Sequence, residues 1–234
     1  MNPGIRVRRA LWSAVIFLTL IGSAVAVRRM VHLVPIAVRG YHPPAVTSNP
    51  VAAQFAALDD LFAHYPIVTL VHIVPGLLFM LLGPLQFSST IRARHLRWHR
   101  WSGRVFVVCG VVIGISALVM SLGMPAIGGI NQAAATTLFA MFFLFALCKA
   151  FWHIRRREIP LHREWMIRAF SVGIAVATIR LIVGMFFATS RFSSLSPREF
   201  FGIAFWIGFV LHLIAAEAWI HATVPHQETV SALE

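Results

Sequence analysis

The chain has 234 residues, of which 59% are hydrophobic and 12% charged, and its formal net charge at pH 7 is +12. Soluble domains carry about 25% charged residues, so this composition excludes an ordinary soluble protein and indicates a membrane protein. The arginines gather in short segments beside apolar runs and form no separate basic domain, which argues against nucleic acid as a partner and favours the lipid bilayer.

The first predicted element is an N-terminal transmembrane helix within residues 1–29. Three arginines precede an apolar run over residues 11–27, which is long enough to cross about 30 Å of hydrocarbon. Ala24 and Ala26 also fit a secretory cleavage site. Two arginines would follow that cut almost at once, so we expect a retained, signal-anchor-like helix.

Residues 30–66 form the one long connection, which we expect to be an outer loop. The pair Asn49-Pro50 is typical of a helix start, because proline is favoured in the first turn. Apolar residues follow it near helical spacing and predict a short amphipathic helix on the outer surface. Loops of this length are often functional, so the segment is a candidate lid.

Five further transmembrane helices are predicted, each long enough to span the bilayer. They cover residues 67–87, 101–122, 133–152, 165–187 and 200–220. Gly110 and Gly114 form a small-xxx-small pair that would let two helices approach closely. The predicted fold is therefore an all-α polytopic membrane protein with six helices. Residues 67–187 would form a four-helix core, and residues 188–234 the sixth helix and a short tail.

Two polar segments lie between the predicted core helices. Residues 95–104 contain three arginines, two histidines and two tryptophans, and residues 162–170 repeat His-Arg, Trp, Arg and Phe in the order found from His99 onward. Charges are costly in hydrocarbon, so both segments must lie at a membrane surface. Their shared chemistry predicts two hairpins that turn at the same face.

Most of the 20 Lys and Arg residues fall on that face or at the helix ends beside it. The positive-inside rule places this side in the cytoplasm. We therefore predict a protein of the bacterial inner (cytoplasmic) membrane, with both termini in the cytoplasm.

Polar residues within the predicted spans are candidate site residues, because burying them in lipid is expensive. They are His72, Gln86, Arg180, His212 and Glu217. His72 and Arg180 are expected roughly 8 and 10 Å below the outer surface, at about 1.5 Å per residue. One interpretation is a ligand pocket of His72, Gln86 and Arg180 for a quinone-like or anionic small molecule, whose carboxylate or phosphate would pair with the guanidinium. The other is structural: Arg180 bonds to helix carbonyls and His72 is satisfied in the core.

His99 and His162 are expected at the inner ends of their helices. One interpretation is a belt of tryptophan and basic residues in the headgroup region. Another is that the two imidazoles are the metal ligands of haem b, one on each side of the iron, with Arg104 and Arg168 pairing the propionates. A third is a transition-metal site, since other histidines lie close by in the sequence.

The last predicted helix carries His212, Glu217 and His221. These residues are only partly in helical register, with Glu217 and His221 on one face. They allow a proton path, or a simpler arrangement in which Glu217 reaches the interface or pairs with a loop arginine.

A set of short motifs supports a family resemblance. They are His72-x-x-Pro75-Gly76, Gly83-Pro84-Leu85-Gln86, Arg92-x-Arg94, His99-Arg100-x-x-Gly103-Arg104, His162-Arg163-x-x-x-x-Arg168 and Ala177-Thr178-Ile179-Arg180. With these motifs the chain resembles the bacterial predicted membrane proteins grouped as domain of unknown function 2306, over about residues 67–187. The resemblance implies that the polar positions belong to one pattern, and it implies no activity. A more distant likeness to the membrane b-type cytochromes implies at most one haem, because only His99 and His162 match in depth.

The leading functional hypothesis from the sequence is haem-linked membrane electron transfer or a redox accessory role. The alternatives are a carrier or binder of a small anionic or lipid-like molecule, and an assembly factor of a membrane complex. A homo-oligomer or a larger complex is compatible with all three, and the sequence identifies no catalytic residue.

Overall fold

The computed structural model describes the chain except for residues 1–2, 42–55, 57–58, 190–191, 193–194 and 224–234. All regular structure in the described part is helical. The elements are α1 (Pro3–Arg39), α3 (Pro66–Phe87), α4 (Ser89–Arg94), α5 (Leu96–Gly123), α6 (Gly129–Arg155), α7 (Ile159–Thr189) and α8 (Pro197–Thr223). Residues 56 and 59–63 are also helical.

Six of the described helices are long and apolar enough to cross a membrane: α1, α3, α5, α6, α7 and α8. This confirms the predicted all-α fold with six candidate spans. Many large apolar side chains on these helices are exposed, as expected where helices face lipid and not water. The protein is an integral membrane protein in contact with the bilayer.

Helix α1 is longer than predicted. The sequence suggested that the first helix ends before residue 30, yet α1 continues to Arg39 and contains 37 residues, about 55 Å at 1.5 Å per residue. The prediction was wrong because the arginines after the apolar run do not end the helix. Instead, Arg28 and Arg29 bond to Asp59 beside it. The predicted start of the short loop helix at Asn49-Pro50 lies outside the described residues.

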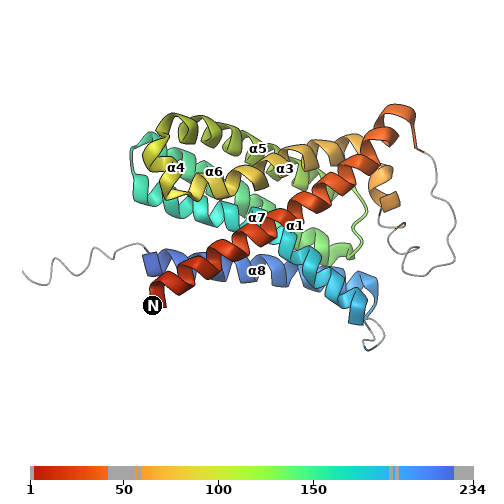
Figure 1. The fold of residues 1–234 in the computed structure, drawn as a ribbon. Coiled ribbons are helices and arrows are strands. Elements are labelled where there is room, and N and C mark those ends of the chain that lie inside the picture. The colour runs from red at the N-terminus through yellow and green to blue at the C-terminus, as the bar shows by residue number, and fades with distance from the viewer. Residues whose placement is uncertain (1–2, 42–55, 57–58, 190–191, 193–194, 224–234) are drawn as a thin grey trace, which may run out of the picture.

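The two predicted hairpins turn at the same end of the bundle (Figure 1). Helix α4 joins α3 to α5 there, and a short turn with Arg157 at a φ of 64° joins α6 to α7. The polar segments are mostly helical: they form the first turns of α5 and α7, which begin at Leu96 and Ile159. We call this end the α4 end, and the other, where α3 and α8 begin, the cavity end.

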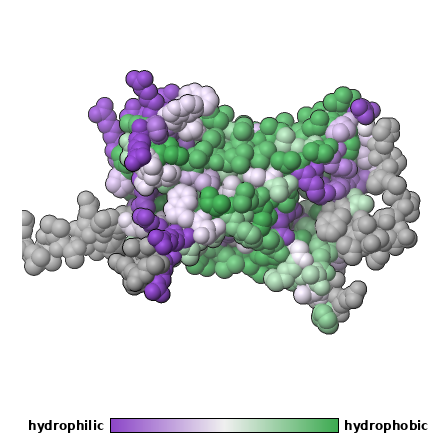
Figure 2. Space-filling model, in the orientation of Figure 1, coloured by the Kyte–Doolittle hydropathy of each residue, from purple (hydrophilic) through white to green (hydrophobic). Residues whose placement is uncertain are grey.

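The core helices pack in sequence order, α3 against α5, α5 against α6, and α6 against α7. Helix α8 covers α6 and α7, and α1 crosses α3 and α7 on another side (Figure 1). Figure 2 shows hydrophobic residues across the middle of one face and hydrophilic residues gathered mainly toward the α4 end, with a smaller group at the cavity end. This distribution matches a bundle whose middle lies in hydrocarbon.

Aromatic rings fill the centre of the bundle. Phe79 of α3 is 1% exposed and stacks on Phe106 of α5, with ring centroids 4.1 Å apart. Phe143 of α6 and Phe170 of α7 complete the cluster, at 5.6 and 6.0 Å from Phe79. Four helices thus contribute rings at the same level, which separates the cavity end from the α4 end.

The Gly110 and Gly114 pair lies where α5 meets α6, as predicted for close helix packing. A Cβ on Gly110 would come 2.7 Å from a methyl carbon of Leu147, and one on Gly114 would come 2.5 Å from a methyl carbon of Leu144. Both distances are well inside van der Waals contact, so α6 reaches its position only because α5 has glycine there.

Candidate ligand-binding cavity

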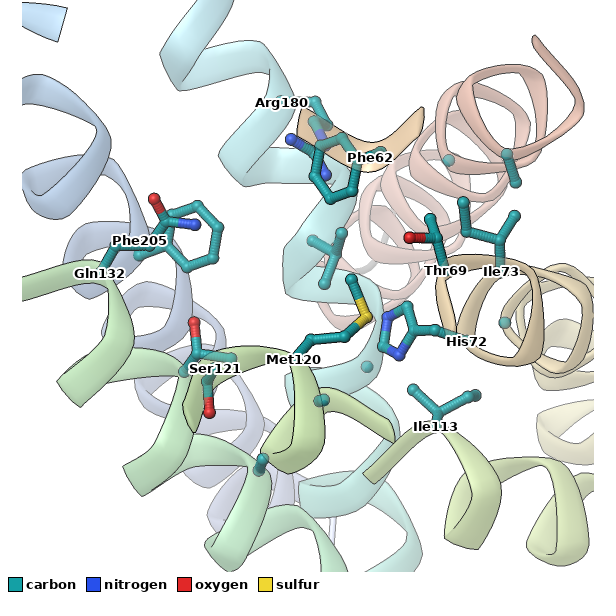
Figure 3. A pocket seen from close by; sticks show the side chains of 18 of the residues that line it. Phe62, Thr69, His72, Ile73, Ile113, Met120, Ser121, Gln132, Arg180 and Phe205 are labelled. Carbon is teal, nitrogen blue, oxygen red and sulfur yellow. The ribbon is translucent and has the colours of Figure 1, made fainter. Parts of the chain in front are cut away.

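A cavity of about 270 Å³ lies between the helices at the cavity end (Figure 3). Helices α1, α3, α5, α6, α7 and α8 all contribute to its wall, and most of the wall is apolar. Phe79 and Phe143 of the aromatic cluster also line it. The polar side chains in the wall are Arg29, Thr69, His72, Ser121, Gln132, Thr136 and Arg180. An apolar chamber with a few polar groups is the usual form of a small-molecule site.

Several of the polar lining groups have partners within the protein. Thr69 donates its hydroxyl to the carbonyl of Tyr65 at 2.8 Å, and the Ser121 hydroxyl lies 2.9 Å from that of Thr137. Gln132 accepts from the amide of Gly128 at 2.7 Å. The Thr69 and Ser121 hydroxyls and the Gln132 carbonyl oxygen therefore help to hold the helices around the cavity.

Arg180 differs from them. Its guanidinium projects from α7 into the cavity beside Phe62 (Figure 3). The Nε atom is buried and has no hydrogen-bond partner, and among the described residues no carboxylate forms an ion pair with this arginine. A buried charge without a partner is costly and is rarely retained without a role.

A cluster of ionic groups lies at the side of the cavity lined by Arg29, Phe62 and Arg180, which we call its mouth. Asp59 accepts from Arg29 of α1 at 2.5 Å and from Arg28 at 3.0 Å, and Arg29 also stacks over the ring of Phe62 at 4.4 Å. Arg180 is close enough to both arginines to feel their charge. Two guanidinium groups therefore share one carboxylate and a third, that of Arg180, lies near them, so the mouth has an excess of positive charge.

The structure brings His72 of α3 into the same cavity as Arg180 (Figure 3). The His72 Nδ1 atom lies 2.9 Å from the hydroxyl of Ser116 on α5. Gln86, which the sequence assigned to this pocket, does not line the cavity. It is 14 residues further along α3, about 21 Å away at 1.5 Å per residue, and donates to Ser102 at 2.7 Å.

His99 and His162 lie at the α4 end and are close enough for their charges to interact. The His162 Nδ1 atom bonds to the carbonyl of Ala150 at 2.9 Å, which leaves Nε2 as its other nitrogen. The His99 Nδ1 atom is buried and has no partner among the described residues. Arg104 is exposed.

Arg168 is already engaged. Its Nε and one terminal nitrogen donate to the two carboxylate oxygens of Glu217 on α8, at 2.6 and 2.9 Å. Glu164 lies 3.5 Å away on the same helix, and the Trp165 ring is 4.7 Å from the guanidinium carbon. A propionate at Arg168 would have to displace Glu217. His212 bonds instead to Thr178 of α7 at 2.7 Å, so it and Glu217 have separate partners.

Three residues of the site were not found from the sequence: Arg29, Asp59 and Ser116. In the sequence, Arg29 has the position of a charged residue that ends a membrane span, and Asp59 that of a polar residue on a surface helix, so neither was a candidate. Ser116 offered the only local signal, because it is a hydroxyl residue in a long apolar run. Within the described residues no three His, Cys, Asp or Glu side chains are placed to hold a metal ion.

A family model described as "Predicted membrane protein (DUF2306)" matches residues 69–220, which include both ends of the bundle. No curated protein and no solved structure matches the chain.

Proposed function

The chain belongs to the DUF2306 family of predicted membrane proteins, whose description names no activity. We therefore propose a function from the cavity itself: it binds a small amphipathic anion. The acidic or phosphate-like head would pair with Arg180, and the apolar body would lie against the rest of the wall. The observation that supports this most directly is the buried guanidinium of Arg180, which has no acceptor among the described residues.

The excess positive charge at the mouth favours an anionic ligand over a neutral or cationic one. Arg28 and Arg29 already hold the carboxylate of Asp59, and Arg180 faces the cavity beside them. Guanidinium pairs with carboxylate or phosphate through two parallel hydrogen bonds, which is the strongest single interaction such a wall can offer.

The dimensions support a small ligand with an apolar body. At about 30 Å³ per water, a volume of about 270 Å³ corresponds to roughly nine waters, or a molecule of about ten non-hydrogen atoms. The phenylalanines and methionines of the wall, among them Phe205 and Met120, would bury such a body away from water.

Octanoate has the required charge and size, so it is a suitable first probe. At about 100 times its Kd, a ligand stabilises the folded protein by about 2.7 kcal/mol, which raises the melting temperature of a chain of this size by roughly 5–11 °C. We expect this shift in the detergent-purified protein and its loss in Arg180→Met, which keeps an unbranched, though shorter, side chain and removes the charge.

Arg104→Met is the matched control, because Arg104 is exposed at the α4 end. It should keep the full octanoate shift. A shift that persists in Arg180→Met, or that octylamine produces as well as octanoate, would contradict the proposal of an anion site.

A second candidate function is haem-linked electron transfer at the α4 end, with His99 and His162 as iron ligands. It is favoured by one specific arrangement: the His162 Nδ1 bond to Ala150 leaves Nε2 available, which is the usual arrangement of a metal-binding histidine. Because Arg168 bonds to Glu217, Arg104 is the better placed of the two predicted propionate partners.

An optical spectrum separates the two candidates. A haem protein should show a Soret band and sharp bands after reduction with dithionite, and both His99→Ala and His162→Ala should remove them. A protein that stays colourless after haem supplementation would exclude this candidate and leave the anion site unaffected.

A further inference from the structure

Ser116 determines which nitrogen of His72 carries the proton. The Ser116 hydroxyl lies 2.7 Å from the carbonyl of Val112 and 3.1 Å from that of Ile113, so its single proton is donated within α5. With its proton donated there, the hydroxyl accepts from His72 Nδ1, at 2.9 Å. This arrangement favours the tautomer in which Nδ1 carries the proton.

The second nitrogen of His72 has a different character. In a neutral imidazole with Nδ1 protonated, Nε2 bears a lone pair and acts as an acceptor. The ring projects into the cavity (Figure 3), and no partner for Nε2 lies among the described residues. The wall thus presents a strong donor, the Arg180 guanidinium, together with one imidazole acceptor.

We infer that the ligand carries a hydroxyl group in addition to its anionic head, and that His72 Nε2 accepts the hydrogen bond from this hydroxyl. The inference rests on the proposed anion site and names its ligand class more narrowly as a hydroxylated amphipathic acid. Ser116 is a positioning residue, because it acts on the ligand only through the tautomer of His72.

The inference makes a quantitative prediction about ligand preference. A neutral hydrogen bond to a buried acceptor contributes a gain in affinity of about 2- to 12-fold. Among octanoate and its 2-hydroxy, 3-hydroxy and 8-hydroxy derivatives, at least one hydroxylated acid should therefore bind that much more tightly than octanoate. Isothermal titration of the purified full chain measures this difference.

Variants assign the gain to His72. His72→Phe keeps a flat ring and removes the acceptor, so the ratio of the two affinities should fall and the preference for the hydroxylated acid over octanoate should be lost. Thr69→Val is the matched control: it removes a cavity hydroxyl that already bonds to Tyr65 and should keep the preference.

Ser116→Ala tests the tautomer separately and does not depend on the folding of the His72 variant. In 15N spectra of histidine-labelled protein, one imidazole should change from a fixed Nδ1–H form toward exchange between tautomers, and the hydroxyl preference should shrink. A purely structural role for Ser116 would lower stability without this spectral change.

The outcomes separate the two proposals. Octanoate binding without any gain from a hydroxyl, or a gain that survives His72→Phe, overturns this inference and leaves the anion site standing. Absence of binding by all four acids overturns both.

Discussion

Two arginines of α7 show how differently the two ends of the bundle are built. Arg168 and Arg180 are 12 residues apart on one helix, about 18 Å at 1.5 Å per residue. Arg168 makes two hydrogen bonds to Glu217 and lies beside Glu164 and Trp165. Arg180 has no acceptor among the described residues and faces a cavity.

The difference shows that a charge in a membrane bundle can be paired within the protein or left facing a cavity, and that the neighbouring helices decide which. At the α4 end, α8 supplies a carboxylate that neutralises Arg168. At the cavity end the Asp59 carboxylate is already shared by Arg28 and Arg29. Substituting the two α7 arginines should therefore have opposite effects on stability.

The largest effect is expected for Arg168→Met. It leaves the Glu217 carboxylate, whose side chain is 41% exposed, without its arginine partner. We expect a cost between that of a surface pair and that of a fully buried pair, about 2–3 kcal/mol. The melting temperature of the detergent-purified protein should fall by roughly 4–12 °C. The double variant Arg168→Met/Glu217→Leu should recover part of this loss, and a loss that stays complete would argue against the ion pair as its cause.

Gly83→Ala tests how tightly α3 packs against the aromatic ring cluster that lies between the cavity end and the α4 end. A Cβ at this position of α3 would come within 2.1 Å of the Phe170 ring, which is itself held by Phe79, Phe87 and Phe106. Overpacking of this kind costs about 1–3 kcal/mol. Thermal melting should show the loss, and an unchanged melting temperature would mean that the ring cluster can move aside.

Arg180→Met should have the opposite sign from Arg168→Met. Removing a buried charge that has no partner relieves its desolvation cost, so the ligand-free protein should become more stable by about 1 kcal/mol. The melting temperature should rise by roughly 2–4 °C. A fall comparable to that of Arg168→Met would show that Arg180 is a structural residue, and the contrast between the two ends would be lost.

Gly76→Ala should have the smallest effect, and it is the counterpart of Gly83→Ala on the same helix. Gly76 lines the cavity, and a Cβ there would meet nothing within 4 Å. Alanine is favoured over glycine in a helix by about 0.5–1 kcal/mol, so thermal melting should show an unchanged or slightly more stable protein. A marked loss of stability would mean that the cavity is smaller than the structure indicates.

Much of the fold could be predicted from the sequence, because its signal is local. Each apolar run is long enough to span hydrocarbon, and the charged segments between the runs must leave it, so the six helices follow from hydropathy alone. The same reasoning failed at α1. Two arginines mark where an apolar run ends, but arginine is itself a good helix former, so the helix continues past them. The structure adds that Asp59, from elsewhere in the chain, pairs with both.

The candidate site could be predicted only in part. His72 and Arg180 were singled out because any polar group in hydrocarbon needs an explanation, and their depths placed both near one surface. Gln86 was singled out for the same reason but lies in the other half, because a span of 22 residues reaches from one end of the bundle to the other. The depth of Gln86 could therefore have been inferred from the sequence, whereas only the packing of the helices shows that His72 and Arg180 face the same cavity.

The sequence by itself thus determined that this is a polytopic α-helical membrane protein, which polar residues it carries into the membrane, and that its two polar hairpins turn at one face. Only the tertiary structure decided which of those residues are partnered. Helix α8 packs against α7 and brings Glu217 to Arg168. Arg180, on the same helix, faces the cavity, and no described carboxylate pairs with it. Such contacts join residues far apart in the chain, and no local pattern encodes them.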